Sequence, residues 1–151
     1  MRKQLAAAFC IAALATPGFS AAQSQATWTS SYTDGVVTAT ETDDHGHVTA
    51  IIQCRPPTGD IVVSDFTLAR DGRRARTSGI GIGNMTVNVP SRVERNGRQD
   101  ALMINLPQRP PILAGVQPTD HITITVNNRT RVLSDGSAVK MKEVAYGCWG
   151  S

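Results

Sequence analysis

Short runs in which apolar and polar residues alternate, separated by turn residues, constrain the fold of this chain more than any other feature. Residues at every second position of a strand point to the same face, and one run places four apolar residues in this way: Val48, Ala50, Ile52 and Cys54. A turn at residues 43–47, where Gly46 can adopt a positive φ, separates this run from an alternating run at 36–42. We therefore expect an antiparallel hairpin over residues 35–54 whose inward face includes Cys54.

Further alternating runs continue along the chain, at 61–68, 85–89, 92–95, 98–106, 121–127 and 129–133. Asn96-Gly97 between two of these runs is a strong hairpin signal. Pro90 is expected to end a strand, because proline cannot donate a hydrogen bond to the ladder. The glycine-rich segment at 79–83 is expected to be a flexible connection or an edge strand. Seven or eight short strands favour a mainly β fold, a small antiparallel β-sandwich or barrel.

The run at 61–68 shows which of its residues should be buried. Its apolar face is expected to carry Val62, Phe66 and Leu68. Asp65 and Thr67 occupy the alternate positions, so we expect them on the opposite face of the strand.

Both ends of the chain that follows residue 22 differ from this pattern, and the C-terminal end predicts a helix. After Asp135-Gly136-Ser137, apolar residues recur at helical spacing. We favour one short C-terminal helix over residues 137–147, with a strand that turns Val139 and Met141 inward as the competing assignment. Residues 23–30 are polar and are expected to be loose, with Trp28 resting on the sheet.

The N-terminus resembles an export signal. Arg2 and Lys3 precede an apolar run from 5 to 15, and small residues at Ser20 and Ala22 suit cleavage after Ala22. The apolar run is shorter than the roughly 20 residues that cross a bilayer, so no transmembrane segment is expected after cleavage. We therefore expect a signal peptide at 1–22 and a single β-rich domain at 23–151, exported to the periplasm or secreted from a bacterium.

Cleavage changes both the charge and the cysteine count. Loss of Arg2 and Lys3 lowers the formal net charge from +3 to +1, so no general attraction to nucleic acid is expected.

Loss of Cys10 leaves Cys54 and Cys148, which are 94 residues apart. In an oxidising compartment such a pair is typical of a disulfide, whose chain-entropy stabilisation would be about 4–5 kcal/mol. The alternatives are a metal pair or a catalytic thiol, but neither cysteine has a second cysteine or histidine at zinc-site spacing.

Two polar segments are candidate sites. The first is the turn containing His45 and His47, where Asp43 and Asp44 could supplement the imidazoles as metal ligands. A polar hairpin tip without a metal explains the same residues, because Asp, Gly and His suit a tight turn.

The second candidate site is a loop with four arginines in seven residues, whose guanidinium groups match phosphate, sulfate or carboxylate geometry: Arg70, Arg73, Arg74 and Arg76. The alternative is that these four arginines are solvated on a surface loop and bind no partner.

Signatures of catalysis are absent from the sequence. It contains neither the Gly-x-Ser-x-Gly nucleophile motif nor the His-Glu-x-x-His zinc motif. The spacing of glycines at 79–83 does not fit a dinucleotide-binding loop, so no cofactor is expected. Five aromatic residues after cleavage provide no stacking platform for single-stranded nucleic acid. The sequence thus indicates a non-catalytic protein.

The overall layout resembles small exported β-proteins of bacteria, among them the invasion-associated locus B type and periplasmic inhibitors of lysozyme or proteases. The shared features are the signal peptide, a sheet-rich domain of this size, an inward strand ending in Cys54, and Cys148 near the C-terminus. The resemblance assigns no functional residue. We expect a non-catalytic exported binding protein whose partner is a protein or an envelope component, and the arginine loop is the candidate contact if that partner is anionic. The alternative is a periplasmic metal-binding protein that uses the turn with His45 and His47.

Overall fold

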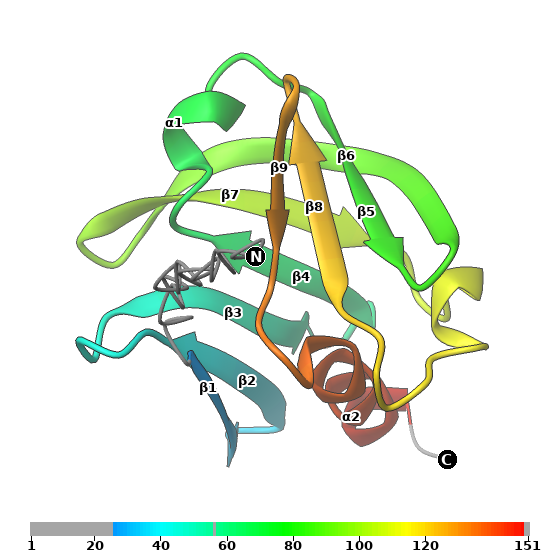
Figure 1. Cartoon of the computed structure of the whole chain (residues 1–151). Helices are drawn as coiled ribbons and strands as arrows, with labels where there is room; N and C mark the ends of the chain where they lie inside the picture. The colour runs from blue at the N-terminus through cyan, green and yellow to red at the C-terminus, as the bar shows by residue number, and fades with distance from the viewer. Residues whose placement is uncertain (1–25, 56, 150–151) are drawn as a thin grey trace, which may run out of the picture.

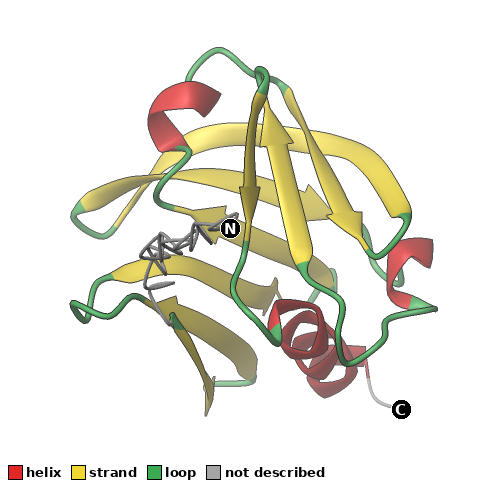
Figure 2. Ribbon diagram, viewed as in Figure 1, coloured by secondary structure: helices red, strands yellow, loops and turns green. Residues whose placement is uncertain are grey.

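A single curled antiparallel sheet forms the body of the protein. The structure, a computed structural model, describes residues 26–55 and 57–149, so the predicted signal peptide at 1–22 lies outside the described residues. Within the described ranges nine strands pair in the order β1-β2-β3-β4-β7-β6-β5-β8-β9 (Figures 1 and 2). The elements are β1 Thr27–Thr33, β2 Val36–Thr42, β3 Val48–Arg55, β4 Asp60–Asp65, α1 Ala69–Gly72, β5 Thr77–Ile82, β6 Met85–Asn96, β7 Gln99–Leu106, η1 Pro111–Leu113, β8 Ile122–Val126, β9 Arg129–Val132 and α2 Ser137–Trp149. The prediction of a mainly β fold with one C-terminal helix is confirmed.

The long strand β6 curls the sheet into a half-barrel. Its first half pairs with β5 and its second half pairs with β7. Pro90 is opposite Thr77 in the last pair with β5, and the next residue, Ser91, is opposite Ile104 of β7. The prediction that Pro90 ends a strand is wrong, because β6 continues through it. Proline has no N–H to donate to a neighbouring strand, and Pro90 lies at the position where β6 changes its pairing partner from β5 to β7.

The core fills the concave side of this sheet. Alternate residues of the central strands are completely buried there, including Ile52, Ile80, Ile104 and Ile124. Helix α2 packs across β2 and β3 at one end of the half-barrel (Figure 1), with Ala138, Met141, Val144 and Ala145 buried. The helical spacing read from the sequence thus identified the buried face of α2.

Two segments that were expected to be irregular are strands. Thr27–Thr33 forms the edge strand β1 rather than a loose tail, and Trp28 packs against the core as expected. Thr77–Ile82 forms β5, which lies between β6 and β8 and is therefore neither an edge nor a flexible connection. A Cβ added to Gly81 would lie 3.2 Å from Thr86 Oγ1, so a small residue suits the close approach of the neighbouring strand.

The burial of Asp65 differs most clearly from the predicted pattern. It is fully buried at the end of β4, on the same strand face as the core residues Ile61 and Val63. Val62 is buried too, in a second cluster with Ala101 and Met103 on the other side of the sheet. Because both faces of β4 are buried, alternation of residue type could not separate an inward from an outward face.

None of the helices in the described ranges is long and apolar enough to cross a membrane.

The contact between α2 and β2 yields the first prediction. A Cβ added to Gly147 would lie 2.6 Å from Val37 Cγ2, so Gly147→Ala forces the helix and strand apart. We expect the clash to outweigh the gain in helix propensity of up to about 1 kcal/mol and to lower the free energy of unfolding by about 1–2 kcal/mol. Urea denaturation measures the change. Gly115→Ala is the control, because a Cβ there meets nothing within 4 Å; equal stability of the two variants would contradict this packing.

Candidate functional site

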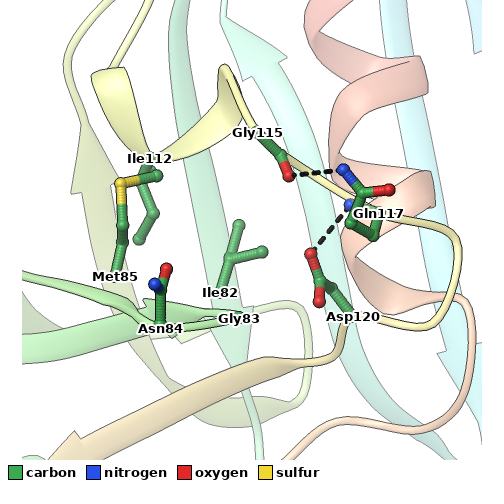
Figure 3. Close-up of a pocket in the computed structure, with 8 residues that line it drawn as sticks. All are labelled: Ile82, Gly83, Asn84, Met85, Ile112, Gly115, Gln117 and Asp120. Carbon is green, nitrogen blue, oxygen red and sulfur yellow. Dashed lines mark hydrogen bonds between the residues drawn. The ribbon is translucent and has the colours of Figure 1, made fainter.

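A shallow cavity lies beside the β5–β6 turn. It has a volume of about 400 Å³ and is shown in Figure 3 between that turn and the loop after η1. Its lining residues are Ile82, Gly83, Asn84, Met85, Ile112, Gly115, Gln117 and Asp120. The carboxylate of Asp120, the one titratable group among them, accepts a hydrogen bond from the backbone N–H of Gln117 at 2.8 Å. The lining therefore has no acid–base pair, and Asp120 holds its own loop.

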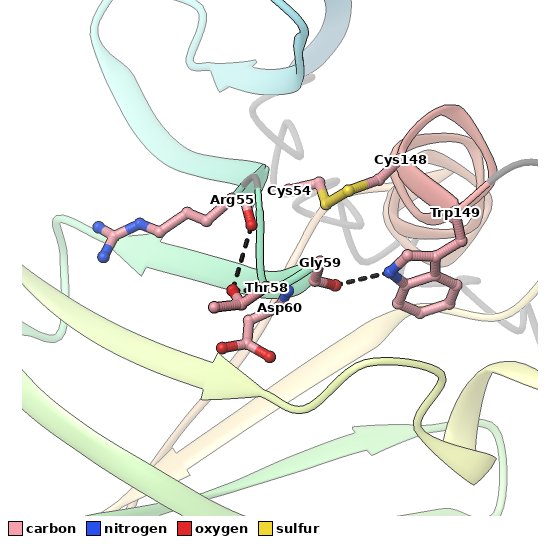
Figure 4. Close-up of a disulfide and its surroundings, with 7 residues drawn as sticks. All are labelled: Cys54, Arg55, Thr58, Gly59, Asp60, Cys148 and Trp149. Atoms are coloured by element: carbon pink, nitrogen blue, oxygen red, sulfur yellow. Dashed lines mark hydrogen bonds between the residues drawn. A yellow bond between two sulfur atoms is a disulfide. The ribbon is translucent and has the colours of Figure 1, made fainter.

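The C-terminal end of α2 is fastened to the sheet by a disulfide. Cys54 at the end of β3 is bonded to Cys148 in the last turn of α2, with their Cα atoms 6.0 Å apart (Figure 4). The next residue, Trp149, donates its indole N–H to the carbonyl oxygen of Gly59 at 2.6 Å. Gly59 has φ +73° and touches the indole. The predicted disulfide is confirmed, and it is compatible with an oxidising, exported location.

A buried cluster of charged side chains, which the sequence analysis missed, joins the edge strand β9 to β2 and β4 in the other half of the curled sheet. Arg131 of β9 is opposite Ile124, so it points into the concave side. One of its nitrogens contacts the carboxylate of Asp65 and the other contacts the carboxylate of Glu41 in β2. The side chains of Glu41 and Asp65 are 1% and 0% exposed, and that of Arg131 is 18% exposed. We call Glu41, Asp65 and Arg131 the charged triad.

Both carboxylates of the triad accept further hydrogen bonds, and Arg131 donates one to the carbonyl oxygen of Thr49 at 3.0 Å. Glu41 accepts hydrogen bonds from Thr49 Oγ1 at 2.6 Å and from the backbone N–H of Ser134 at 2.7 Å. Asp65 accepts from the backbone N–H groups of Thr67 and Leu68 at 2.9 and 2.7 Å. Burial by itself raises the pKa of Glu41, but the hydrogen bonds from Thr49 and Ser134 and the charge of Arg131 together lower this pKa below its ordinary value. The triad is thus a hydrogen-bonded structural link between β2, β4 and β9.

The turn between β2 and β3 holds the predicted metal ligands. Asp43 accepts hydrogen bonds from the backbone N–H groups of His47 and His45 at 2.8 and 2.9 Å, and the bond from His47 is the main reason why the pKa of Asp43 is lowered. The rings of His45 and His47 are 6.1 Å apart, and Asp44 lies 3.6 Å from His45. In the described part of the chain no three His, Cys, Asp or Glu residues are grouped so as to hold a metal. Metal binding at this turn stays a prediction.

The predicted arginine loop comprises α1 and the residues that follow it. Arg70, Arg73, Arg74 and Arg76 are all exposed. The backbone beneath them is closely held, because a Cβ on Gly72 would lie 2.6 Å from Leu102 Cδ1 of β7. The side-chain amide of Asn127, in the β8–β9 turn, also donates to the carbonyl of Asp71 at 2.8 Å.

Two other segments bring more arginines to this end of the molecule. Asp100 of the β6–β7 hairpin lies 3.4 Å from both Arg73 and Arg95 and so connects the hairpin to the loop. Arg98 lies in the turn of this hairpin, and Arg129 follows the β8–β9 turn. In Figure 1, α1 and the β8–β9 turn lie at the end remote from α2, and the hairpin projects on the same side as α1. We call this region the arginine end: Arg70, Arg73, Arg74, Arg76, Arg95, Arg98 and Arg129.

Charge is unevenly distributed as a result. Residues 70–76, 95–100 and 129, which contain the arginine end, carry seven cations and the two acids Asp71 and Asp100, a formal charge of +5. The rest of residues 26–149 carry six cations and ten acids, a formal charge of −4. The small net charge of the chain is therefore the sum of a strongly basic end and an acidic remainder. Sequence reasoning identified only the loop with Arg70, Arg73, Arg74 and Arg76 as part of that basic end.

The disulfide gives a prediction about stability. Cys54→Ala/Cys148→Ala should lower the free energy of unfolding by about 2–5 kcal/mol, because the bond closes a loop of 94 residues. Urea denaturation with and without reductant measures this. Reductant should destabilise the wild-type protein and leave the double variant unchanged; an equal response of both proteins would show that the effect does not come from this bond.

The triad gives a prediction about pH. Because the pKa of Glu41 is lower in the folded protein than the ordinary value of 4.5 for this side chain, ionised Glu41 stabilises the fold above that value, and this contribution is lost as pH falls through the lower, folded pKa. Glu41→Gln should therefore lower the free energy of unfolding at pH 7 by about 1–3 kcal/mol and flatten its decline in acid.

Thermal or urea unfolding at pH 7 and at mildly acidic pH tests this. The control is Glu143→Gln, since Glu143 is about half exposed and paired only at the surface with Lys140; such a pair contributes at most about 1 kcal/mol. An acid dependence in Glu41→Gln as steep as in the wild type would exclude Glu41 as its source.

The chain matches no family model, no curated protein and no solved structure. A role for the arginine end therefore rests on the charge, exposure and contacts of this chain's own residues.

Proposed function

We propose that this is a non-catalytic exported binding protein that holds an anionic face of another protein or of an envelope component at its arginine end. The single observation that supports this most is the charge distribution, with seven arginines and two acids on three adjoining segments. Guanidinium groups form paired hydrogen bonds with carboxylates and phosphates. An anionic partner would also be oriented by the negative remainder of the molecule, which repels it from other faces.

The scaffold beneath the arginines supports a binding role. Gly72 packs on Leu102, and Asn127 joins α1 to the β8–β9 turn. Loops held by a rigid sheet lose little conformational freedom when a partner binds. Asp100 lies between Arg73 and Arg95 and spaces their guanidinium groups while leaving both side chains 68% exposed.

Charge reversal tests this proposal. Arg73→Glu/Arg74→Glu should weaken capture of the partner from an envelope extract at least tenfold, because it removes two anion contacts and adds two repulsive charges. Arg55→Glu/Arg109→Glu is the matched control, since both residues are exposed and lie outside the arginine end. The control changes net charge equally and should leave capture unchanged.

Two further readouts define the partner. Vesicles with and without anionic lipid distinguish an envelope lipid from a protein partner, and added salt should weaken either interaction. If the same partners are captured by the wild type and by the arginine-end variant, with both folded by circular dichroism, the arginine end is not the binding site.

A further inference from the structure

The two edges of the sheet differ in how they are protected. β9 is short, with four residues, and it turns the charge of Arg131 inward; short edge strands and inward charges are common ways to prevent strand addition. β1 has seven residues, none charged and none proline, paired with β2 in seven consecutive positions. Among the residues that the structure describes, no strand pairs with the outer edge of β1. β1 therefore presents a regular, uncharged edge that can accept another strand.

The sequence of β1 is nearly symmetric about its centre. Thr27-Trp28-Thr29-Ser30-Ser31-Tyr32-Thr33 reads almost the same in both directions. We propose that β1 pairs in antiparallel fashion with β1 of a second copy of this chain, around a two-fold axis at Ser30. That register places Trp28 opposite Tyr32 of the other copy, Thr29 opposite Ser31, and Thr27 opposite Thr33. Aromatic pairs and Thr–Thr or Thr–Ser pairs are favourable across strands.

The surroundings of Ser30 suit such an axis. Ser30 accepts a hydrogen bond from Lys140 of α2 at 3.1 Å and lies 3.4 Å from the carboxylate of Glu143, so one charge of each sign adjoins the centre of β1. Two copies meeting there bring no net charge together. An isologous interface of this kind requires a self-complementary surface, which the symmetric strand and the balanced pair provide.

Exposed aromatic side chains near β1 also support the proposal that a second copy covers the outer edge of this strand. Tyr32 is 71% exposed, while Trp28 on the same strand face packs partly against the core. Tyr32 is opposite Val37, which touches Gly147 of α2, and the neighbouring Tyr146 is 53% exposed. The proposed pairing lays each Tyr32 beside Trp28 of the other copy and removes apolar ring surface from water. This inference is independent of the proposed function, because β1 and the arginine end share no residue.

The dimer should be weak. Stable interfaces commonly bury about 1,200–2,000 Å² in total, and a single seven-residue strand with its aromatic neighbours provides less. We expect a dissociation constant of about 1–100 μM, seen as a monomer–dimer equilibrium in sedimentation velocity over a range of concentrations. The protein is expressed from its complete gene in a secreting bacterial host.

The register allows a charge-pair test. Because residue 29 is opposite residue 31 of the other copy, Thr29→Lys/Ser31→Lys puts lysine against lysine at two positions and should weaken dimerisation at least tenfold. Thr29→Lys/Ser31→Glu puts lysine against glutamate at the same positions and should dimerise at least as well as the wild type. Within one copy both positions are opposite threonines of β2, Thr40 and Thr38, so the two variants should fold equally well.

Each outcome bears on the proposal. A concentration-dependent dimer that only the lysine–lysine variant loses supports it. A wild-type protein that stays monomeric throughout, or a dimer to which both variants respond alike, overturns it, as would open-ended aggregation in place of a closed dimer. Circular dichroism and urea denaturation of the variants separate loss of dimerisation from loss of folding.

Discussion

The contact of Arg131 with Glu41 and Asp65 holds the curled shape on which the rest of the structure depends. Strand β9 ends the sheet on one side, whereas β2 and β4 belong to its other half, so this contact closes the open side of the half-barrel. Burying three charges is expensive unless their hydrogen bonds are complete, and here each carboxylate is bonded to the backbone as well as to the guanidinium. The triad also selects the register of β9. A shift by one residue would turn Val132 inward, which hydrophobicity alone favours, but would leave both carboxylates without Arg131.

The triad and the disulfide fix different parts of the same assembly. Glu41 binds the backbone of Ser134, in the segment that leads from β9 into α2, and Cys148 bonds the far end of α2 to β3. Both ends of the helix are thereby tied to neighbouring strands of the sheet. At the opposite end, α1 rests on β7 through Gly72. The triad is an ionic link, the disulfide is a covalent link and the packing of Gly72 is a steric one, so no single change in solution conditions releases all of them.

Local signals explain what the sequence predicted correctly. The 35–54 hairpin, the turn at Gly97, the C-terminal helix and the pairing of Cys54 with Cys148 each follow from residue spacing or turn chemistry over short distances, or from the count of cysteines. The failures share a different cause. Asp65 and Arg131 look like surface residues until each has the other as a partner, 66 residues away. Likewise, β1 and β5 lack a strong apolar alternation. β1 is an exposed edge, and β5 has Gly81 where the strand lies close to Thr86.

The arginine end, too, depends on residues that are distant in the sequence and that only the fold brings together. The sequence predicted a basic loop at Arg70–Arg76, whereas Arg95, Arg98 and Arg129 join it only through the hairpin and turn that the fold brings beside α1. A formal charge of +1 for residues 23–151 is consistent with a protein that has no electrostatic preference. Folding separates that charge into a basic end and an acidic remainder, and a separated charge orients a partner even when the net charge is small. The binding property we propose therefore belongs to the fold, because no segment of the chain carries it alone.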